Sequence, residues 1–356
     1  MGRVRPFVED DIPQVVELNT RSFPRSATLS PETQQHRFRE ICLKNPWFHE
    51  EIRSLVYQED DGRIAGFLAV IPRHMSFHGT RITIGAAQHM MVDRATLASL
   101  QLFKAFISGP QELAMGDMSV DVTRKLFERI GGSTSYLHSI YWVYPLRPIT
   151  YFASLGRRRQ MESKSGSAYS SFTHYFDELC AHTRLNPFRI KEPVLKEEDL
   201  TPELFLANFP TFARDSSLLP VYTLQSISWL FEVLSKESRF GAFRKIAVRD
   251  HDGGVAGWYV YNALQGGRGE VLQVCATPRT ISAVLDHLFH DAWRHGCTDL
   301  AGRVDPLFMK DFSEKHCLIT PGRDWMLIHS RQPEIMNAIF RGDAFLTRLE
   351  GDLWFL

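Results

Sequence analysis

A seventeen-residue phrase of this chain recurs far downstream in a form one residue shorter. Residues 55–71 read LVYQEDDGRIAGFLAVI, and residues 246–261 read IAVRDHDGGVAGWYVY. In each copy an apolar run meets an Asp-Gly turn and then a second apolar run, a pattern typical of a β-hairpin. The sequence therefore predicts the same hairpin twice, and repeated supersecondary units indicate a repeated fold.

The spacing of the two copies extends the match beyond the turn. Asp61 and Asp252 are 191 residues apart, and the Ala-Gly-aromatic triplets at 65–67 and 256–258 keep that offset. The same offset aligns residues of the preceding helical segments, Trp229 with Phe38 and Leu234 with Leu43. We interpret the agreement of helix and hairpin as an internal duplication. The alternative is chance recurrence of common hairpin chemistry.

Length and composition limit the class of protein. A chain of 356 residues is longer than one hydrophobic core usually organises, so two domains are expected. Hydrophobic residues make up 44% and charged residues 23%, as in an ordinary globular protein. The 41 basic residues balance the 41 acidic ones, so we expect no dedicated nucleic-acid binder and no general attraction to anionic membranes.

The N-terminal residues and the cysteines favour a cytoplasmic protein. The first residues are charged and lack the apolar core of a signal peptide, and no apolar stretch has the length of a membrane span. The five cysteines are scattered and form no CxxC pair: Cys42, Cys180, Cys275, Cys297 and Cys317. They predict buried, reduced thiols and neither a metal site nor a disulfide framework.

Apolar periodicity and turn residues predict the order of elements in each half. Ser30 and Pro31 suit a helix cap and first helical position, and Gly131-Gly132 suits a helix end. The first half predicts strand 4–7, helices 12–19 and 31–43, the hairpin, strand 81–92, helix 100–107, strand 113–118, helix 120–130 and a last strand at 136–144. The second half predicts helices through residue 231, the hairpin, strand 270–276, helix 281–295 and strand 300–304.

The composition changes to GRRRQMESKSGSAYSS at 156–171, which is typical of a linker or an exposed loop. Its basic triplet at 157–159 could contact a phosphate, although a solvated surface run is the more common role of such charges. We therefore expect a first domain at 1–156, a connecting segment at 157–186 and a second domain at 187–356.

The segment from Gln88 to Phe106 predicts a strand, a loop and a helix. A helix N-terminus presents backbone N–H groups and the positive end of its dipole, so it can hold a pyrophosphate. This segment, the order of elements and the late helix TRKLFERIGG at 123–132 resemble the GNAT superfamily of acyl-CoA-dependent N-acetyltransferases. The resemblance covers the first half well and the second half in outline. It implies an α/β (α+β) fold with two GNAT-like domains, each a mixed central sheet flanked by helices.

The resemblance also implies where the cofactor, acetyl-CoA or another acyl-CoA, is held. The family's phosphate-binding turn reads Q/R-x-x-G-x-G/A, and residues 94–99 keep the Arg and a small last residue but place Leu97 at the first Gly. Glycine there lets the backbone approach the pyrophosphate closely. The backbone N–H groups near Met91 and Val92 would support the thioester and its developing oxyanion. The implied cofactor-binding residues are Met91, Val92, Arg94, Ala95, Thr96, Leu97, Ala98 and Ser99.

Catalytic residues are implied in the same way. In the family, a residue of the long strand often acts as general base toward the acceptor amine, and Gln88 and His89 are the polar residues of 81–92 nearest its end. Histidine titrates in the range that proton removal near neutral pH requires, although a lone histidine is more often an ordinary hydrogen-bonded residue.

The family's frequent general acid and the acceptor site are implied less directly. The general acid is a tyrosine, and Phe127 stands at that position, so the role is empty or passes to Tyr136, Tyr141 or solvent. Asp117 and Asp121 flank the expected cleft and could bind a cationic acceptor, although a solvent-exposed carboxylate is the default expectation.

The second half departs from the family at the equivalent turn. Residues 276–281 read ATPRTI, without glycine, and Pro278 removes a backbone donor. This predicts a second domain that has lost its cofactor site and could instead shape the acceptor pocket. We therefore expect an acyl-CoA-dependent N-acyltransferase, most simply an N-acetyltransferase, acting on an amine of a small molecule or sugar. Two alternatives stay open: a non-catalytic binding or scaffold protein, and an acyltransferase with an acyl carrier protein or aminoacyl-tRNA as donor.

Overall fold

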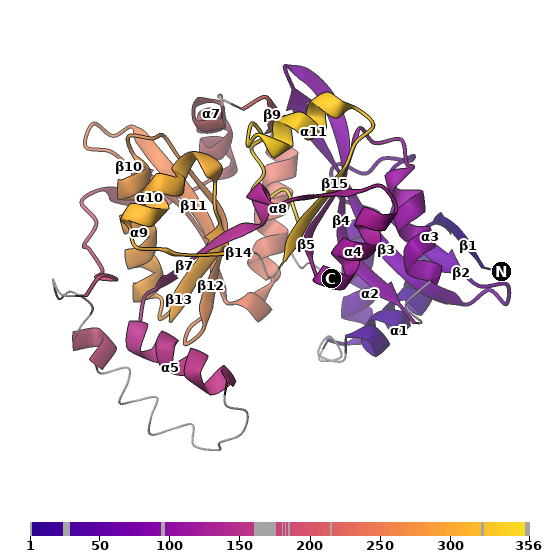
Figure 1. Ribbon diagram of the computed structural model, residues 1–356, viewed down its shortest axis with the longest axis horizontal. Coiled ribbons are helices and arrows are strands. Elements are labelled where there is room, and N and C mark those ends of the chain that lie inside the picture. Colours follow the sequence, from indigo (N-terminus) through magenta and orange to yellow (C-terminus); the bar gives the residue numbers. More distant parts are fainter. Residues whose placement is uncertain are drawn as a thin grey trace. The chain divides into compact units, whose positions relative to one another are not determined.

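The computed structural model describes residues 2–23, 29–93, 97–159, 176–179, 181, 183, 186–213, 216–321 and 324–352. Over these residues the strands form two mixed sheets of eight and seven strands, each flanked by helices (Figure 1). The chain divides into two compact units that are discontinuous in sequence. The first unit comprises residues 1–139, 215–234 and 323–356, and the second comprises residues 140–214 and 235–322.

The first sheet has the strand order β1-β2-β3-β4-β5-β15-β6, and a short strand, β9, pairs with β3. Its strands are β1 (Arg3–Pro6), β2 (Leu55–Gln58), β3 (Ile64–Phe77), β4 (Thr80–Val92), β5 (Leu113–Ser119), β6 (Ser133–Ser135), β9 (Leu218–Pro220) and β15 (Trp325–His329). Its helices are α1 (Ile12–Ser22), α2 (Pro31–Cys42), α3 (Leu97–Ile107), α4 (Asp121–Arg129), α8 (Leu224–Lys236) and α11 (Pro333–Phe340).

Successive side chains of β3 point to opposite faces of the first sheet. Phe67 packs edge-on against Phe38 of α2, with ring centroids 5.5 Å apart. Its neighbour Leu68 lies in a buried cluster with Leu102 of α3 and Phe127 of α4. We call these two sides the α2 face and the α3 face.

The second sheet has the order β14-β7-β13-β12-β11-β10-β8. Its strands are β7 (Ile140–Pro145), β8 (Lys196–Asp199), β10 (Ala242–Arg249), β11 (Val255–Ala263), β12 (Arg268–Ala276), β13 (Asp299–Arg303) and β14 (Leu318–Pro321). The helices of this unit include α5 (Pro148–Arg159), α7 (Pro202–Ala213), α9 (Ile281–Arg294) and α10 (Met309–Glu314).

The two sheets share one strand order. Matching β1-β2-β3-β4-β5-β15-β6 with β8-β10-β11-β12-β13-β7-β14 places the predicted hairpins, β2–β3 and β10–β11, at equivalent positions. In both sheets the sixth strand comes from the other half of the chain, because β15 lies between β5 and β6, and β7 lies between β13 and β14. Both sheets therefore repeat one strand order, as expected from an internal duplication, and the sixth strand of each sheet is exchanged between the halves of the chain.

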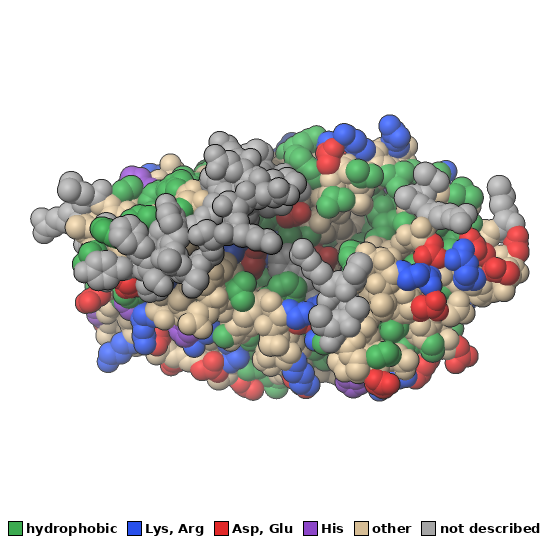
Figure 2. Space-filling model, turned by 90° about the horizontal axis from the view of Figure 1, so that it is seen from below, with side chains coloured by type: hydrophobic (Ala, Val, Ile, Leu, Met, Phe, Trp, Pro, Cys, Tyr) green, Lys and Arg blue, Asp and Glu red, His purple; other side chains and the backbone are tan. Residues whose placement is uncertain are grey.

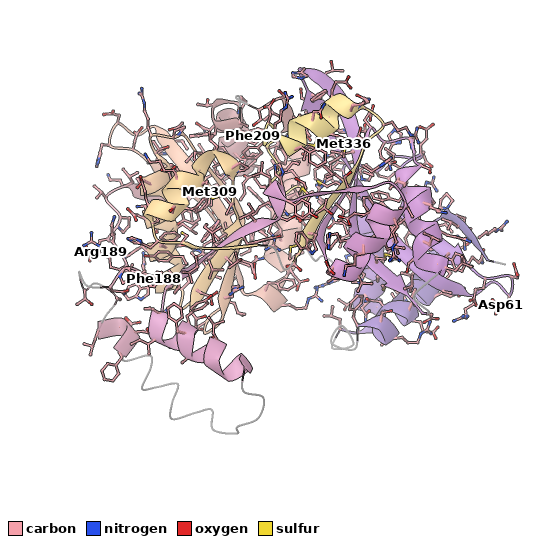
Figure 3. The ribbon with its side chains drawn as sticks, in the orientation of Figure 1. Asp61, Phe188, Arg189, Phe209, Met309 and Met336 are labelled. Atoms are coloured by element: carbon pink, nitrogen blue, oxygen red, sulfur yellow. The ribbon has the colours of Figure 1, made fainter. Side chains whose placement is uncertain are left out.

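The repeated Ala-Gly pair has a packing reason in both copies. A β-carbon at Gly66 would lie 3.0 Å from Leu102 of α3, and one at Gly257 would lie 2.9 Å from Val284 of α9. Each glycine thus lets the equivalent helix approach its sheet closely. The Asp-Gly turns need glycine for a different reason, since Gly62 and Gly253 have φ of 88° and 83°. Asp61 marks the tip of the first hairpin (Figure 3).

Two predictions about local structure are wrong. The strand expected at 136–144 is interrupted by a short helix, Leu137–Ser139, and its second part, β7, belongs to the second sheet. The loop expected from residue 156 is wrong over its first residues, because α5 continues to Arg159. Residues 160–175 lie outside the described residues. The boundaries 1–156, 157–186 and 187–356 follow the order of the repeats and stay a prediction, whereas the compact units exchange segments.

The described cysteines Cys42, Cys275, Cys297 and Cys317 are buried, as predicted, and Cys180 lies outside the described residues. Burial raises the pKa of the Cys42 thiol to about 12, which makes it a poor nucleophile near neutral pH. Within the described ranges, no helix combines the length and the apolar character needed to cross a membrane. Basic and acidic side chains are interspersed on the face shown in Figure 2.

Candidate functional site

Strands β4 and β5 run parallel but share a ladder over only part of their length. The register begins at Ile84 with Leu113 and ends at Ala87 with Gly116, whereas β4 continues to Val92 and β5 to Ser119. On its other side β4 stays paired with β3 as far as Val92. The β4–β5 ladder therefore does not include the last residues of β4. A strand edge of this kind can pair with an extended, amide-bearing ligand.

A β-bulge lies in β4 immediately before this opening. Leu68 of β3 pairs with Met90 and Val70 pairs with Ala87, so Ala69 faces two residues, Gln88 and His89. Ala87 and Met90 both belong to the cluster on the α3 face. Gln88 instead contacts the C-terminal segment that follows α11, and His89 contacts α1, so the bulge turns both predicted base candidates away from this cluster.

Gln88 contacts the C-terminal segment of the chain. Its side-chain amide donates a 2.7 Å hydrogen bond to the carbonyl of Gly351. Asp117 of β5 is only 5% exposed, and its Oδ1 accepts a 2.8 Å bond from the Met118 N–H. Gly351 lies so close to this carboxylate that a β-carbon would not fit. The structure thus brings Gln88 and Asp117 together beneath residue 351, and Asp117 is not the solvent-exposed carboxylate expected by default.

His89 ends a relay of buried amides on the α2 face. Its Nε2 lies 3.1 Å from Oδ1 of Asn19, whose Nδ2 donates a 3.0 Å bond to Oε1 of Gln34. The amide nitrogen of Gln34 donates a 3.1 Å bond to the carbonyl of Leu29. The ring of Phe23 packs against the imidazole with centroids 4.7 Å apart. Asn19 and Gln34 are functional candidates that the sequence did not suggest.

The predicted phosphate-binding turn is described only at its ends. Arg94, Ala95 and Thr96 lie outside the described residues. Leu97 is the first residue of α3 and is 42% exposed, while Ala98 and Ser99 are buried against the sheet. Asp93, just before the turn, forms ion pairs with Arg21 at 3.2 Å and Arg63 at 2.5 Å. Residues 94–96 therefore connect a well-anchored strand end to the N-terminus of an eleven-residue helix.

The equivalent turn of the second unit satisfies its own backbone donors. The N–H of Thr277 donates to Oγ1 of Thr280 at 3.0 Å, and the N–H groups of Thr280 and Ile281 donate to the Thr277 carbonyl. These donors are thus used within the turn, and Pro278 contributes none. This turn differs from a helix N-terminus that holds an anion.

Comparison with known proteins identifies the fold to which this arrangement of strands belongs. No family model and no curated protein sequence matches the chain. A solved structure from Enterococcus faecalis V583, a conserved protein of unknown function described as a probable N-acyltransferase, matches 93% of this chain and 73% of its own, with a TM-score of 0.59 and 10% identity. The Saccharomyces cerevisiae N-myristoyltransferase with bound myristoyl-CoA matches 92% of this chain and 77% of its own, with a TM-score of 0.54 and 12% identity.

A GCN5-related N-acetyltransferase from Anabaena variabilis ATCC 29413 matches 92% of this chain and 72% of its own, with a TM-score of 0.54 and 13% identity. The chain has the GNAT fold. The matches span both units, so the mixed sheets and their flanking helices confirm the predicted fold class. Identities this low concern the fold, and the reaction has to be inferred from the site.

The other predicted residues lie farther from β4 in this GNAT fold. Tyr136 follows β6, which is separated from β4 by β5 and β15, a distance of roughly 14 Å at ordinary strand spacing. Its ring packs against Trp325 at 5.6 Å, and its hydroxyl lies 3.4 Å from Arg124. Asp121 begins α4 and forms 2.7 Å ion pairs with Arg124 and Lys125. Tyr141, the other tyrosine considered, lies in β7 of the second sheet.

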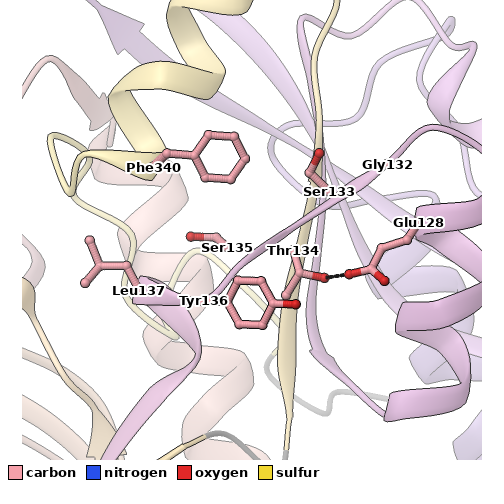
Figure 4. A pocket seen from close by; sticks show the side chains of 8 residues that line it. All are labelled: Glu128, Gly132, Ser133, Thr134, Ser135, Tyr136, Leu137 and Phe340. Atoms are coloured by element: carbon pink, nitrogen blue, oxygen red, sulfur yellow. Dashed lines mark hydrogen bonds between the residues drawn. The ribbon is translucent and has the colours of Figure 1, made fainter.

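A cavity of about 630 Å³ lies beside β6 (Figure 4). The hydroxyl of Thr134 donates a 2.6 Å hydrogen bond to Glu128 at its wall, and Phe340 of α11 lines it as well. Ser135, also at the wall, is hydrogen-bonded to His138 at 2.9 Å. Of the predicted site residues, only Tyr136 lines this cavity. The lining residues are Glu128, Gly132, Ser133, Thr134, Ser135, Tyr136, Leu137 and Phe340.

Two buried ionisable residues, Arg73 and Glu350, lie near the C-terminal segment that follows α11. Arg73 of β3 is 4% exposed and stacks over the ring of Trp47 at 3.9 Å, and burial lowers the pKa of its guanidinium to about 10. Glu350 is 3% exposed, and burial raises the pKa of its carboxyl group, while hydrogen bonds from Thr347 and Tyr222 and the charge of Arg73 act in the opposite direction. The hydrogen bonds that Glu350 accepts from Tyr222 and Thr347 hold the residues next to Gly351, which contacts Gln88.

Proposed function

We propose that the chain is an acyl-CoA-dependent N-acyltransferase whose first unit holds the cofactor. The observation that carries this proposal is the early end of the β4–β5 ladder at Ala87 and Gly116, close to the strand end that leads into α3. The pantetheine arm of an acyl-CoA is an extended chain with two amides, so it suits the edge of β4. The bound acyl-CoA would supply an activated thioester. Myristoyl-CoA in the yeast neighbour supports an acyl-CoA in general, and acetyl-CoA is our specific proposal.

The residues that would hold the cofactor follow the chain from β4 into α3. The backbone of Met91 and Val92 would bind the pantetheine arm and the thioester oxygen. The N-terminus of α3, with Leu97, Ala98 and Ser99, would face the pyrophosphate together with residues 94–96. Leu97 is compatible with this role because its exposed side chain is not needed in the core.

We assign the general-base role to His89, with Gln88 beside it. Both residues follow directly after Ala87, the last residue of β4 that pairs with β5, which supports this assignment. An imidazole at this position can take the proton of an acceptor amine as the amine attacks the thioester directly. Asp117 and Asp121 remain the proposed acceptor-binding carboxylates, and Tyr136 remains the proposed proton donor, with solvent as the alternative.

The acceptor is proposed to be an amine of a small molecule or sugar in a cytoplasmic setting. A cationic amine would be attracted by the carboxylates of β5 and α4. The second unit is proposed to be a GNAT-like domain without a cofactor, since the donors of its equivalent turn are used internally.

Replacing Arg94 by alanine should weaken acetyl-CoA binding about tenfold, the loss of one charge-assisted phosphate contact. The matched control is Arg279→Ala in the equivalent turn of the second unit, which should leave affinity unchanged. Calorimetric titration measures both, and thermal unfolding of both variants should stay near that of the wild type. Equal affinity in the wild type and Arg94→Ala would contradict the assignment of this turn.

A further inference from the structure

The relay of hydrogen bonds behind His89 begins at a group that can act only as an acceptor. The backbone carbonyl of Leu29 can only accept a hydrogen bond, so the atom of Gln34 facing it must be the amide nitrogen. The other end of the same amide, Oε1, then faces Asn19 and accepts from Nδ2. Oδ1 of Asn19 is consequently the atom that faces His89.

This order fixes which nitrogen of His89 carries hydrogen. An amide oxygen is only an acceptor, so Nε2 of His89 must donate to Oδ1 of Asn19 across the 3.1 Å contact. A neutral imidazole has one N–H, and the basic nitrogen is then Nδ1. Reversing any member of the relay would bring two acceptors or two donors together between side chains that are 2% and 4% exposed, where water cannot compensate.

We propose that Asn19 and Gln34 are positioning residues that hold His89 as its Nε2–H tautomer, so that Nδ1 receives the proton of the acceptor amine. The role in catalysis rests on the proposed function, whereas the tautomer itself does not. The proton moves from the amine nitrogen to Nδ1 while the N–C bond forms and the thioester C–S bond breaks, and the electron pair leaves with sulfur. The packing of Phe23 against the imidazole restrains the ring in the orientation that the relay requires.

The relay also joins α1 and α2 to β4, so a purely structural role has to be separated from the proposed one. Nitrogen-15 NMR of the histidine rings distinguishes protonated from unprotonated ring nitrogens directly. The spectrum of His89→Gln identifies the signals that belong to His89. In the wild type at a pH where His89 is neutral, we expect Nε2 protonated and Nδ1 unprotonated.

Two variants test the relay, and one controls for changes in α1. Asn19→Leu and Gln34→Leu should each yield a mixture of the two tautomers, because the oriented acceptor is lost. Thr20→Val, at the next residue of α1, removes only a bond to the Val16 carbonyl and should leave the tautomer unchanged. An Nδ1–H tautomer in the wild type overturns the proposal, and so does an unchanged tautomer in Asn19→Leu.

The wild-type spectrum decides even if both leucine variants fail to fold, because it requires no substitution of Asn19 or Gln34. Titration with acetyl-CoA is run in parallel. A correct tautomer without acetyl-CoA binding would refute the proposed function alone, whereas binding with the wrong tautomer would refute the relay alone.

Discussion

Replacing His89 by glutamine is expected to lower the kcat of acyl transfer about a hundredfold or more, the usual loss when a general base is removed. Glutamine has a similar length and can still donate to Oδ1 of Asn19, but its amide cannot take a proton from an amine. The affinity for acetyl-CoA should stay unchanged, because the cofactor is expected on the backbone of β4 and at the N-terminus of α3. The value of kcat is measured as the rate of CoA thiol release with the most reactive acceptor from a panel of small-molecule amines.

The matched control for this prediction is His36→Gln, an exposed histidine on α2. It should retain the wild-type kcat, which separates the loss of a base from a general effect of removing a histidine. A kcat within twofold of the wild type in His89→Gln would remove His89 from the mechanism and leave Gln88 or a water as the remaining candidates for the base.

Truncating Glu350 to alanine is expected to lower the free energy of unfolding by about 2–6 kcal/mol, because each of two buried hydroxyl donors left without an acceptor costs about 1–3 kcal/mol. The variant removes the acceptor of the Tyr222 and Thr347 hydroxyl groups, and it also removes a carboxyl group near the buried guanidinium of Arg73. Unfolding in urea, followed by tryptophan fluorescence, measures the change. A loss below about 1 kcal/mol would show that Glu350 does not hold the C-terminal segment.

The double variant Arg73→Met, Glu350→Gln is the control, since it removes both charges and keeps an acceptor for Tyr222. It should recover most of the stability lost in Glu350→Ala, because well-packed uncharged replacements of buried charged residues often change the free energy of unfolding little.

The pH dependence of stability has a definite sign as well. Burial raises the pKa of Glu350 above its ordinary 4.5, so its contribution to stability is greatest below that pH and declines as the pH rises through the folded-state pKa. Glu350→Gln should remove this decline.

Local features of the fold follow from the sequence because their causes are local. The Asp-Gly turns at 61–62 and 252–253 set both hairpins, and Ser30 accepts a hydrogen bond from the N–H of Thr33 as a helix cap should. The long strand predicted at 81–92 is β4 at Thr80–Val92, and the strand predicted at 113–118 is β5 at Leu113–Ser119. The periodicity of the apolar residues is sufficient for elements of this kind.

The exchange of β7 and β15 could not be predicted from the same signals. Apolar alternation shows that 140–145 is a strand, but it does not say which sheet the strand joins, because pairing is decided by contacts far apart in the chain. Trp325 pairs with Ser119 across more than 200 residues, for example. The expected last strand of the first half therefore lies in the second sheet.

The surroundings of His89, the candidate base, could not be predicted from the sequence for a related reason. A bulge adds one residue to β4 without changing its composition, so the sequence gives no sign that the adjacent Gln88 and His89 both turn away from the cluster on the α3 face. Asn19 and Gln34 fall on amphipathic helices where a polar residue normally faces solvent, yet both are buried. The contact of Gly351 with Asp117 depends on the course of the C-terminal segment, which no short-range pattern records.

Calorimetric titration of the full-length chain with acetyl-CoA tests the central claim most directly. The account predicts saturable binding with a stoichiometry near one, because the helix N-terminus after β4 is suited to phosphates, whereas the described residues of the equivalent turn in the second unit use their own backbone donors. Two equivalent sites per chain would contradict the assignment of the second unit as cofactor-free. No binding of acetyl-CoA, or of a longer acyl-CoA up to myristoyl-CoA, would contradict the proposed function itself.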